Sequence, residues 1–202
     1  GFAALKPGVT EIEVAEAISA FYVANGAEPK FTAVCFGENG AFPHHYAGQR
    51  VLKGDEAVLL DLGGRKDGYP SDMTRVATVG RAPAEFDKVH AVVEAAVKAA
   101  IAAVKPGVTA SSIDKAARDV IAAAGYGDFF LHRTGHGLGI DIHEPPYITA
   151  TADTVIEEGN VFSIEPGIYL QGRFGIRLEE IVIVRGGKAE VLSELPRAAF
   201  RA

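Results

Sequence analysis

The chain has 202 residues, 48% of them hydrophobic, with a formal net charge of −6 at pH 7. This composition supports a packed core and argues against wholesale disorder. It has no long lysine and arginine run to bind nucleic acid, and no uncharged apolar stretch of about eighteen residues to span a membrane. The single cysteine, Cys35, excludes an internal disulfide and fits a reducing, cytoplasmic location.

An internal repeat organises the chain. The segment ALKPGVT, residues 4–10, recurs as AVKPGVT, residues 103–109, so that Thr10 corresponds to Thr109, 99 positions later. The stop signals keep this offset, because Gly26 closes the first following segment and Gly125 closes the second. The repeat predicts one domain, residues 1–202, built from two related halves of about 1–80 and 81–202.

Each copy of the repeat predicts a helix that begins after Pro-Gly. Thr10 and Thr109 can cap the helix starts, and Glu13 completes a capping box with Thr10. Gly26 and Gly125 suit the left-handed position after a helix end. The apolar residues that recur at helical spacing are Val14, Ala15, Ile18, Phe21 and Tyr22 in the first copy, and Ile113, Ala116, Ala117, Val120 and Ile121 in the second.

A further helix is expected before the second copy, from about Pro83 to Val104. The first copy has only Gly1–Leu5 at the matching place, too short for a stable helix of its own. We therefore expect the chain to be a fragment or a shortened form of a longer protein that has a preceding helix and an N-terminal domain. An apolar groove would then be exposed near Ile12, Val14 and Phe21, a surface compatible with a homodimer.

Strands follow the helices in both halves. The expected strands are residues 56–62 and 73–79 in the first half, and residues 160–165 and 177–184 in the second. Helices followed by strands, twice, predict an α+β fold around an antiparallel or mixed sheet.

Acidic residues lie at or near the ends of these strands. Asp61 ends an apolar run and Asp72 follows a turn-rich segment, so a hairpin would bring the two carboxylates together. Glu165 ends its strand as Asp61 does. Glu179 and Glu180 fall on opposite faces of the last strand, and periodicity does not choose between them. Each residue alone is also compatible with a turn or a solvated strand edge.

His136 lies between two glycines, which would allow a ligand or metal ion to approach closely; the alternative is a surface histidine in a turn. His143 follows seven residues later, too far for a helical pair of zinc ligands. The other candidates predict no chemistry alone: His44 and His45 in an expected loop, His90 and His132 as structural residues, and Cys35 in the core.

Taken together, two aspartates, two glutamates and one histidine form a hard, mostly oxygen donor set that suits a pair of divalent ions. Carboxylates on apolar strands are costly unless their charge is compensated, and metal ions would compensate it. The chain is therefore interpreted as a two-metal hydrolase whose candidate ligands are Asp61, Asp72, His136, Glu165 and Glu179.

Seven short segments cover nearly the whole chain in order: PHH (43–45), DLG (61–63), GYPSDMTR (68–75), GHGLG (135–139), HEPP (143–146), IEPGIY (164–169) and GIRLEE (175–180). In this order they resemble the pita-bread metallopeptidases, the family of methionine aminopeptidase, aminopeptidase P and prolidase. The resemblance implies that family's duplicated α+β fold.

The resemblance also implies a role for each candidate ligand. Asp61 would bind one ion, Asp72 and Glu179 would bridge both, and His136 and Glu165 would hold the second. This choice selects Glu179 over its neighbour. A bridging water or hydroxide would be the nucleophile, and Glu165 would accept and relay its proton.

Residues for the substrate follow from the same resemblance. His44 and His143 would hydrogen-bond the scissile carbonyl and the developing oxyanion. Arg177 would organise the site, its alternative being an ordinary ion pair. Some prolidases carry an arginine just after the His-Glu motif to hold a dipeptide's carboxylate. Here Tyr147 stands nearby, and it cannot offer a bidentate cation, so strict dipeptidase activity does not follow.

The prediction is a metal-dependent exopeptidase, an Xaa-Pro aminopeptidase or dipeptidase that acts on small peptides. It would use two divalent ions, manganese first, with cobalt, zinc or iron also compatible. One alternative is a methionine aminopeptidase-like enzyme. The other is a non-enzymatic binding module on the same fold, against which the complete ligand set argues.

Overall fold

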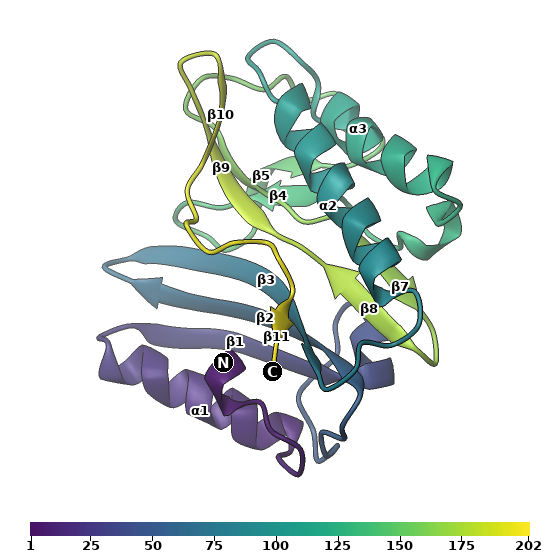
Figure 1. Ribbon diagram of the computed structural model, residues 1–202. Coiled ribbons are helices and arrows are strands. Elements are labelled where there is room, and N and C mark those ends of the chain that lie inside the picture. Colours follow the sequence, from purple (N-terminus) through teal and green to yellow (C-terminus); the bar gives the residue numbers. More distant parts are fainter.

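The structure, a computed structural model, describes residues 1–202 (Figure 1). Its helices are α1 (Glu11–Ala24), α2 (Phe86–Ala103) and α3 (Ala110–Ala123), with short 3-10 helices η1 (Phe2–Ala4), η2 (Gly37–Ala41) and η3 (Gly127–Phe129). Its strands are β1 (Glu28–Phe36), β2 (Glu56–Lys66), β3 (Tyr69–Val79), β4 (Gly135–Gly137), β5 (Glu144–Ile148), β6 (Val161–Ile164), β7 (Gly167–Leu170), β8 (Phe174–Arg177), β9 (Glu180–Arg185), β10 (Lys188–Val191) and β11 (Phe200–Arg201).

The strands form two larger sheets and one hairpin. The first sheet has the order β1-β2-β3-β11, the second has the order β10-β9-β6-β4-β5, and β7 pairs with β8. All pairs are antiparallel except β11 with β3. Figure 1 shows α1 along the first sheet, and α2 beside α3 over the second. The predicted α+β arrangement of helices followed by strands, twice, is confirmed.

The repeat fixes both halves to their sheets by the same backbone contacts. Thr10 forms an antiparallel bridge with Val51, and Thr109 forms the matching bridge with Val155. Each bridge lies directly before a helix, α1 in the first half and α3 in the second. The sequence repeat is therefore also a repeat in three dimensions.

The predicted helix ends are mostly confirmed. Thr10 and Glu13 form the capping box at the start of α1, whereas Thr109 precedes α3 without a capping bond from its side chain. Gly26 and Gly125 adopt left-handed φ angles of 70° and 84°, which only glycine adopts without strain.

The larger apolar core lies between α2, α3 and the strands, and a smaller one lies beneath α1. Cys35 is buried in the larger core, as predicted, and burial raises the pKa of its thiol to about 12. None of the helices combines the length and the apolar character that crossing a membrane requires.

One predicted strand is wrong. Residues 177–184 do not form a continuous strand, because β8 ends at Arg177 and β9 begins at Glu180. The chain changes partner at this point, since β8 pairs with β7 and β9 pairs with β6. Glu179 therefore lies in the break between two strands, where period-two alternation does not apply.

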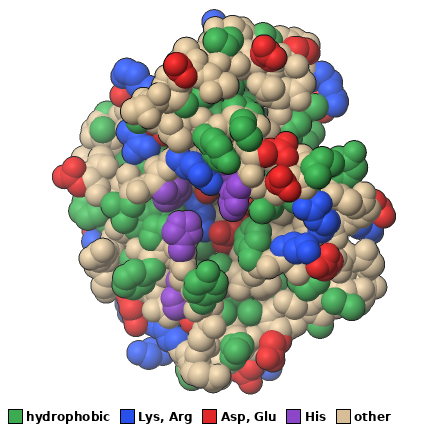
Figure 2. Space-filling view, turned by 180° about the vertical axis from the view of Figure 1, so that it is seen from behind, with side chains coloured by type: hydrophobic (Ala, Val, Ile, Leu, Met, Phe, Trp, Pro, Cys, Tyr) green, Lys and Arg blue, Asp and Glu red, His purple; other side chains and the backbone are tan.

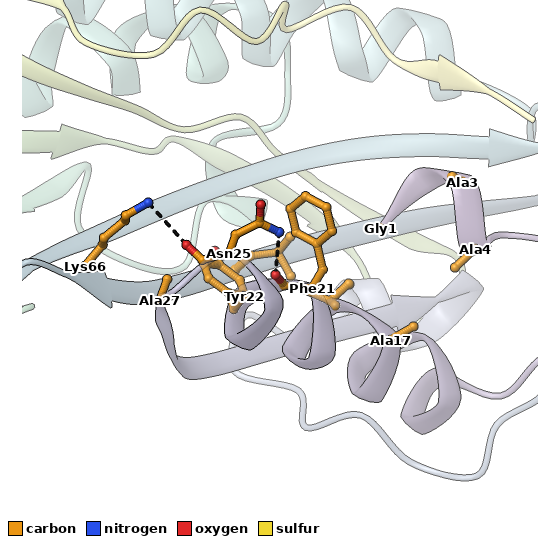
Figure 3. Close-up of a pocket in the computed structure, with 11 residues that line it drawn as sticks. Gly1, Ala3, Ala4, Ala17, Phe21, Tyr22, Asn25, Ala27 and Lys66 are labelled. Atoms are coloured by element: carbon orange, nitrogen blue, oxygen red, sulfur yellow. Dashed lines mark hydrogen bonds between the residues drawn. The ribbon is translucent and has the colours of Figure 1, made fainter.

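The expected apolar groove exists, but only at the C-terminal half of α1. Phe21 is 70% exposed and lines a groove of about 510 Å³ together with Ala3 and Ala4 of η1 (Figure 3). Val14 is buried in the core instead, and Ile12 is half-buried. The groove is thus shifted along the helix from its predicted place.

Candidate active site

The β2–β3 hairpin brings the first two candidate carboxylates to one face. Asp61 lies opposite Thr74, and Asp72 lies opposite Gly63 in the same antiparallel ladder. Directly opposed residues share a face, as do residues two apart on one strand. Asp61, Thr74 and Asp72 therefore all point to the same side, as the predicted hairpin requires.

The second half supplies the other three candidates. His136 is the central residue of β4, Glu165 follows β6, and Glu179 lies between β8 and β9. Ligand atoms of Asp72, His136 and Glu179, all buried, lie within 4.8 Å of one another. Nε2 of His136 is also 3.3 Å from Oε1 of Glu165. The structure thus brings groups from both halves to one place.

The orientation of His136 is set by the backbone. Its Nδ1 lies 3.1 Å from the carbonyl oxygen of Gly137, so Nδ1 carries the proton and donates. Burial lowers the pKa of His136 to about 4, which leaves the ring neutral at pH 7. The lone pair on Nε2 then faces Oδ2 of Asp72 at 3.6 Å as well as Glu165. A lone pair that faces carboxylate oxygens is unfavourable unless a proton or a metal ion lies between them.

The carboxylates also disfavour one another's charge. Burial and the charges of Asp61 and Glu165 raise the pKa of Asp72 well above its ordinary value. Burial and the charges of Asp72 and Glu165 raise the pKa of Glu179 in the same way. Burial raises the pKa of Glu165 to about 7, partly opposed by Arg177. The single charge of Arg177 does not offset these effects, so without further positive charge the carboxylates resist ionising together.

One buried atom has no hydrogen-bond partner: Oδ1 of Asp61. The other carboxylate oxygen of Asp61, Oδ2, accepts a hydrogen bond from Arg177 at 2.5 Å. An unpartnered buried carboxylate oxygen is costly, and a divalent cation would satisfy it. The unpartnered oxygen, the neutral imidazole and the crowded carboxylates all fit a site for divalent metal.

Arg177 connects several of these groups. It donates to Asp61, to the hydroxyl oxygen of Tyr169 at 2.7 Å and to that of Thr74 at 3.0 Å. The Thr74 hydroxyl in turn donates to Oε2 of Glu179 at 2.8 Å. Arg177 therefore contacts one candidate ligand directly and a second through Thr74. Both the organising role and the simpler ion pair account for these contacts.

His132 fits its predicted structural role. Its Nδ1 donates to the carbonyl of Arg133 at 2.7 Å, and its Nε2 lies 2.6 Å from the Tyr169 hydroxyl. Burial and the charge of Arg177 lower the pKa of His132 to about 3, so Nε2 accepts from the tyrosine. His90 likewise bonds only a backbone carbonyl, that of Arg197.

Two of the predicted substrate residues, His143 and Tyr147, lie next to His136. The His143 ring packs at 4.3 Å against the ring of His136, and burial lowers the pKa of His143, assisted by the charges of Arg133 and His44. Tyr147 lies opposite His136 in the β4–β5 ladder. Figure 2 shows histidine side chains gathered around a hollow near the middle of one face, beside acidic and basic side chains.

The glycines around His136 have a different reason from the one expected. A Cβ at Gly135 would lie 1.8 Å from the carbonyl oxygen of Ser163, and one at Gly137 would lie 2.4 Å from that of Pro145. These glycines admit neighbouring backbone rather than a ligand. The neighbour that they admit is useful, because the Ser163 hydroxyl accepts from the backbone N–H of His136 and donates to Glu165.

Glu180 is not a solvated edge residue. It is buried, and its carboxylate binds Arg75 at 2.9 Å and Arg197 at 2.8 Å. Arg75 also donates to the carbonyl of Glu179. Both glutamates of the pair are therefore buried, one facing the cluster and the other held by arginines.

Three residues near the site had not been singled out: Glu11, Asp114 and Arg133. Glu11, on the first turn of α1, and Asp114, the fifth residue of α3, are fully buried carboxylates. All the partners of Glu11 lie 25 or more residues away, and Asp114 combines a local partner, Arg118, with Thr134, 20 residues away. No local pattern therefore indicates that these carboxylates are buried. The guanidinium of Arg133 lies 5.1 Å from the ring centre of Tyr147 and has no carboxylate partner.

Comparisons with known proteins agree with this geometry. Residues 1–186 match the model of metallopeptidase family M24. A probable dipeptidase PepE of Mycobacterium tuberculosis is 45% identical over 194 residues, which are 95% of this chain and 52% of that protein. The Xaa-Pro dipeptidase of Lactobacillus helveticus is 43% identical over 187 residues, 91% of this chain and 51% of that protein. The chain thus spans about half the length of these relatives.

Solved structures of related proteins have the same fold as this chain. Dipeptidase PepE of Mycobacterium ulcerans has a TM-score of 0.95 at 42% identity, covering 98% of this chain and 54% of that one. The X-Pro aminopeptidase of Thermotoga maritima has a TM-score of 0.96 at 38% identity, covering 99% and 57%. These neighbours confirm the pita-bread fold. With its fold, its motifs and the family match in agreement, the chain belongs to metallopeptidase family M24.

Proposed function

We propose that this chain is the catalytic domain of a dinuclear metal-dependent exopeptidase that hydrolyses the Xaa-Pro bond next to a free N-terminus. The observation that best supports it is the convergence of buried carboxylate and imidazole groups from both halves. Relatives named Xaa-Pro dipeptidase and X-Pro aminopeptidase point to the same bond.

Five residues would hold the two ions: Asp61, Asp72, His136, Glu165 and Glu179. Manganese is the first candidate, and cobalt, zinc and iron also suit mixed carboxylate and imidazole donors. Divalent ions bound there would polarise the scissile carbonyl and acidify the attacking water.

The chain's own groups would complete the reaction. Glu165, which lies 3.3 Å from His136 at the edge of the cluster, would accept a proton from the attacking water and pass it to the departing proline nitrogen. His143 and His44 would donate hydrogen bonds to the oxyanion. Arg177 would hold Asp61 and, through Thr74, the carboxylate of Glu179 in place.

A dipeptide substrate would also present a carboxylate, and Arg133 is placed to receive it. Its guanidinium stacks near Tyr147, on the strand next to His136, and its charge acts on both His136 and Glu165. Tyr147 does not replace the arginine of some prolidases by itself. We infer that Arg133 supplies the missing cation from a different position and that Tyr147 orients it.

The dipeptide proposal separates substrates by their C-terminus. Arg133→Met should lower kcat/KM for an Xaa-Pro dipeptide by about tenfold to a hundredfold, the value of one hydrogen bond to a charged group. Hydrolysis of the same dipeptide as its C-terminal amide should not change. An equal loss on both substrates would show that Arg133 does not bind the carboxylate.

The overall function is tested on metal-stripped protein reloaded with manganese, cobalt, zinc or iron. We expect metal-dependent cleavage of Xaa-Pro dipeptides, Xaa-Pro tripeptides or both. Faster release of methionine from peptides without proline would favour the methionine aminopeptidase-like alternative. Failure to cleave any peptide with any metal would favour a binding module. A homodimer and a cytoplasmic location stay predictions.

A further inference from the structure

Glu11 is a buried acid to which the reaction outlined above assigns no role. Although it lies on the first turn of α1, its side chain is fully buried. Its Oε1 accepts from the backbone N–H of Phe36 and from the Asn39 amide, both at 2.8 Å. Its Oε2 accepts from the backbone N–H of Gly48 at 3.1 Å and from Nε2 of His45 at 2.9 Å. Glutamate is almost never fully buried unless its charge is paired or hydrogen-bonded, and these four donors satisfy both oxygens of Glu11.

These four donors belong to a continuous stretch of the first half. Phe36 ends β1, Asn39 lies in η2, and His45 and Gly48 belong to the loop that follows. The backbone of α1 joins the same loop, because the N–H of Ile12 donates to the Gly48 carbonyl at 3.0 Å. Glu11 therefore fastens the loop from within.

This loop carries His44. The residue before it, Pro43, accepts from Arg177 through its carbonyl at 3.5 Å, and the residue after it, His45, is held by Glu11. The His44 side chain is exposed. Arg177, which bonds the Pro43 carbonyl, also binds Asp61, and this places the loop beside the site. His44 is thus positioned only by the residues on either side of it.

We propose that Glu11 is a positioning residue for His44: by fixing His45 and Gly48, it holds the loop so that His44 reaches the bound peptide. This proposal rests on the proposed role of His44 in substrate binding. The competing explanation is that Glu11 only anchors the start of α1. Glu13 offers a matched comparison, because it lies on the same helical turn and binds Thr10 alone.

The decisive substitution is Glu11→Gln. It is made once as a single substitution and once in combination with His44→Ala, and both variants are assayed with metal bound. Glutamine keeps the size of the side chain, but its amide nitrogen cannot accept from His45 or Gly48. We expect kcat to fall about tenfold or more, as small misplacements of a catalytic group do, with metal content unchanged. The Glu13→Gln control should keep kcat.

The double variant decides between the two explanations. If Glu11 acts through His44, Glu11→Gln should cause no further loss of kcat once His44→Ala is present. Independent losses that multiply would overturn the positioning role while leaving the role of His44 standing. Full activity of His44→Ala alone would overturn both roles. If Glu11→Gln does not fold, the same cycle with His45→Ala gives the same test, because it removes one of the donors and leaves the carboxylate in place.

Discussion

Replacing Asp114 by alanine should destabilise the fold where α3 is hydrogen-bonded to Thr134, next to the site. Asp114 is fully buried on α3, and its Oδ1 accepts from the hydroxyl of Thr134 at 2.8 Å and from its backbone N–H at 3.1 Å. Arg118 donates to both carboxylate oxygens, at 2.9 Å and 3.0 Å. The carbonyl of Thr134 then accepts from the N–H of Glu165 at 2.7 Å.

The size of the effect follows from what stays unpaired. Removing one member of a buried ion pair costs about 3–5 kcal/mol of unfolding free energy, because the other charge stays behind. Arg118 is one-third exposed and keeps the carbonyls of Phe130 and His132, whereas the Thr134 hydroxyl loses its acceptor. We therefore expect about 3 kcal/mol, the lower end of that range. For a chain of this size the melting temperature should fall by roughly 6–12 °C.

Urea unfolding followed by circular dichroism measures this change, and a matched control lies on the same helix. Asp119 pairs with Lys115 on the exposed face of α3, where Asp119→Ala should change the unfolding free energy by less than about 1 kcal/mol. The reasoning would be refuted if Asp114→Ala cost no more than Asp119→Ala. The melting temperatures of both variants provide an independent reading.

Three further outcomes are expected at the metal cluster. Asp72→Ala should abolish metal binding together with nearly all activity, and retention of metal, measured by elemental analysis, would exclude Asp72 as a ligand. His143→Ala should leave metal bound while kcat falls about a hundredfold; metal content that falls in step with activity would instead identify a ligand. Burial raises the pKa of Glu165 from 4.5 to about 7 in the metal-free chain. The contribution of this group to the unfolding free energy should therefore be largest below pH 4.5 and should be lost as the pH rises through 7. Urea unfolding with and without divalent metal at pH 5 and pH 8 checks this, and a loss that added metal does not reduce would contradict it.

The helices were predictable because their signals are local. The capping box of Thr10 with Glu13, and the glycines that end α1 and α3, all act within a few residues of the elements that they delimit. The strand break at Leu178 and Glu179 was not predictable in this way. Alternation records which face a residue occupies but not which partner strand it has, and here the chain leaves β7 for β6.

The same limit applies to the site. The candidate ligands stood out because acids on apolar runs are unusual, and the structure brings Asp72, His136 and Glu179 together. Choosing Glu179 over Glu180 needed the family resemblance, since Glu180 is neutralised by Arg75 from a strand about a hundred residues earlier. The burial of Glu180 depends on arginines that are distant in the sequence, and a single sequence does not show which distant residues are in contact.

The duplication places two acids, Asp61 and Glu165, at matching positions of the two halves but in different surroundings. Val51 and Val155 are equivalent through their bridges to the two repeats, and the spacing of 104 positions between them also separates Asp61 from Glu165. The two carboxylates are therefore counterparts. Asp61 is bound to a buried guanidinium at 2.5 Å, whereas Glu165 accepts only a serine hydroxyl and has its pKa raised to about 7 by burial. A carboxylate tied to a permanent cation keeps its charge without metal, whereas Glu165 has no arginine or lysine partner and would need bound ions to stay ionised. We infer that the halves diverged in the partners of these acids rather than in the acids' positions.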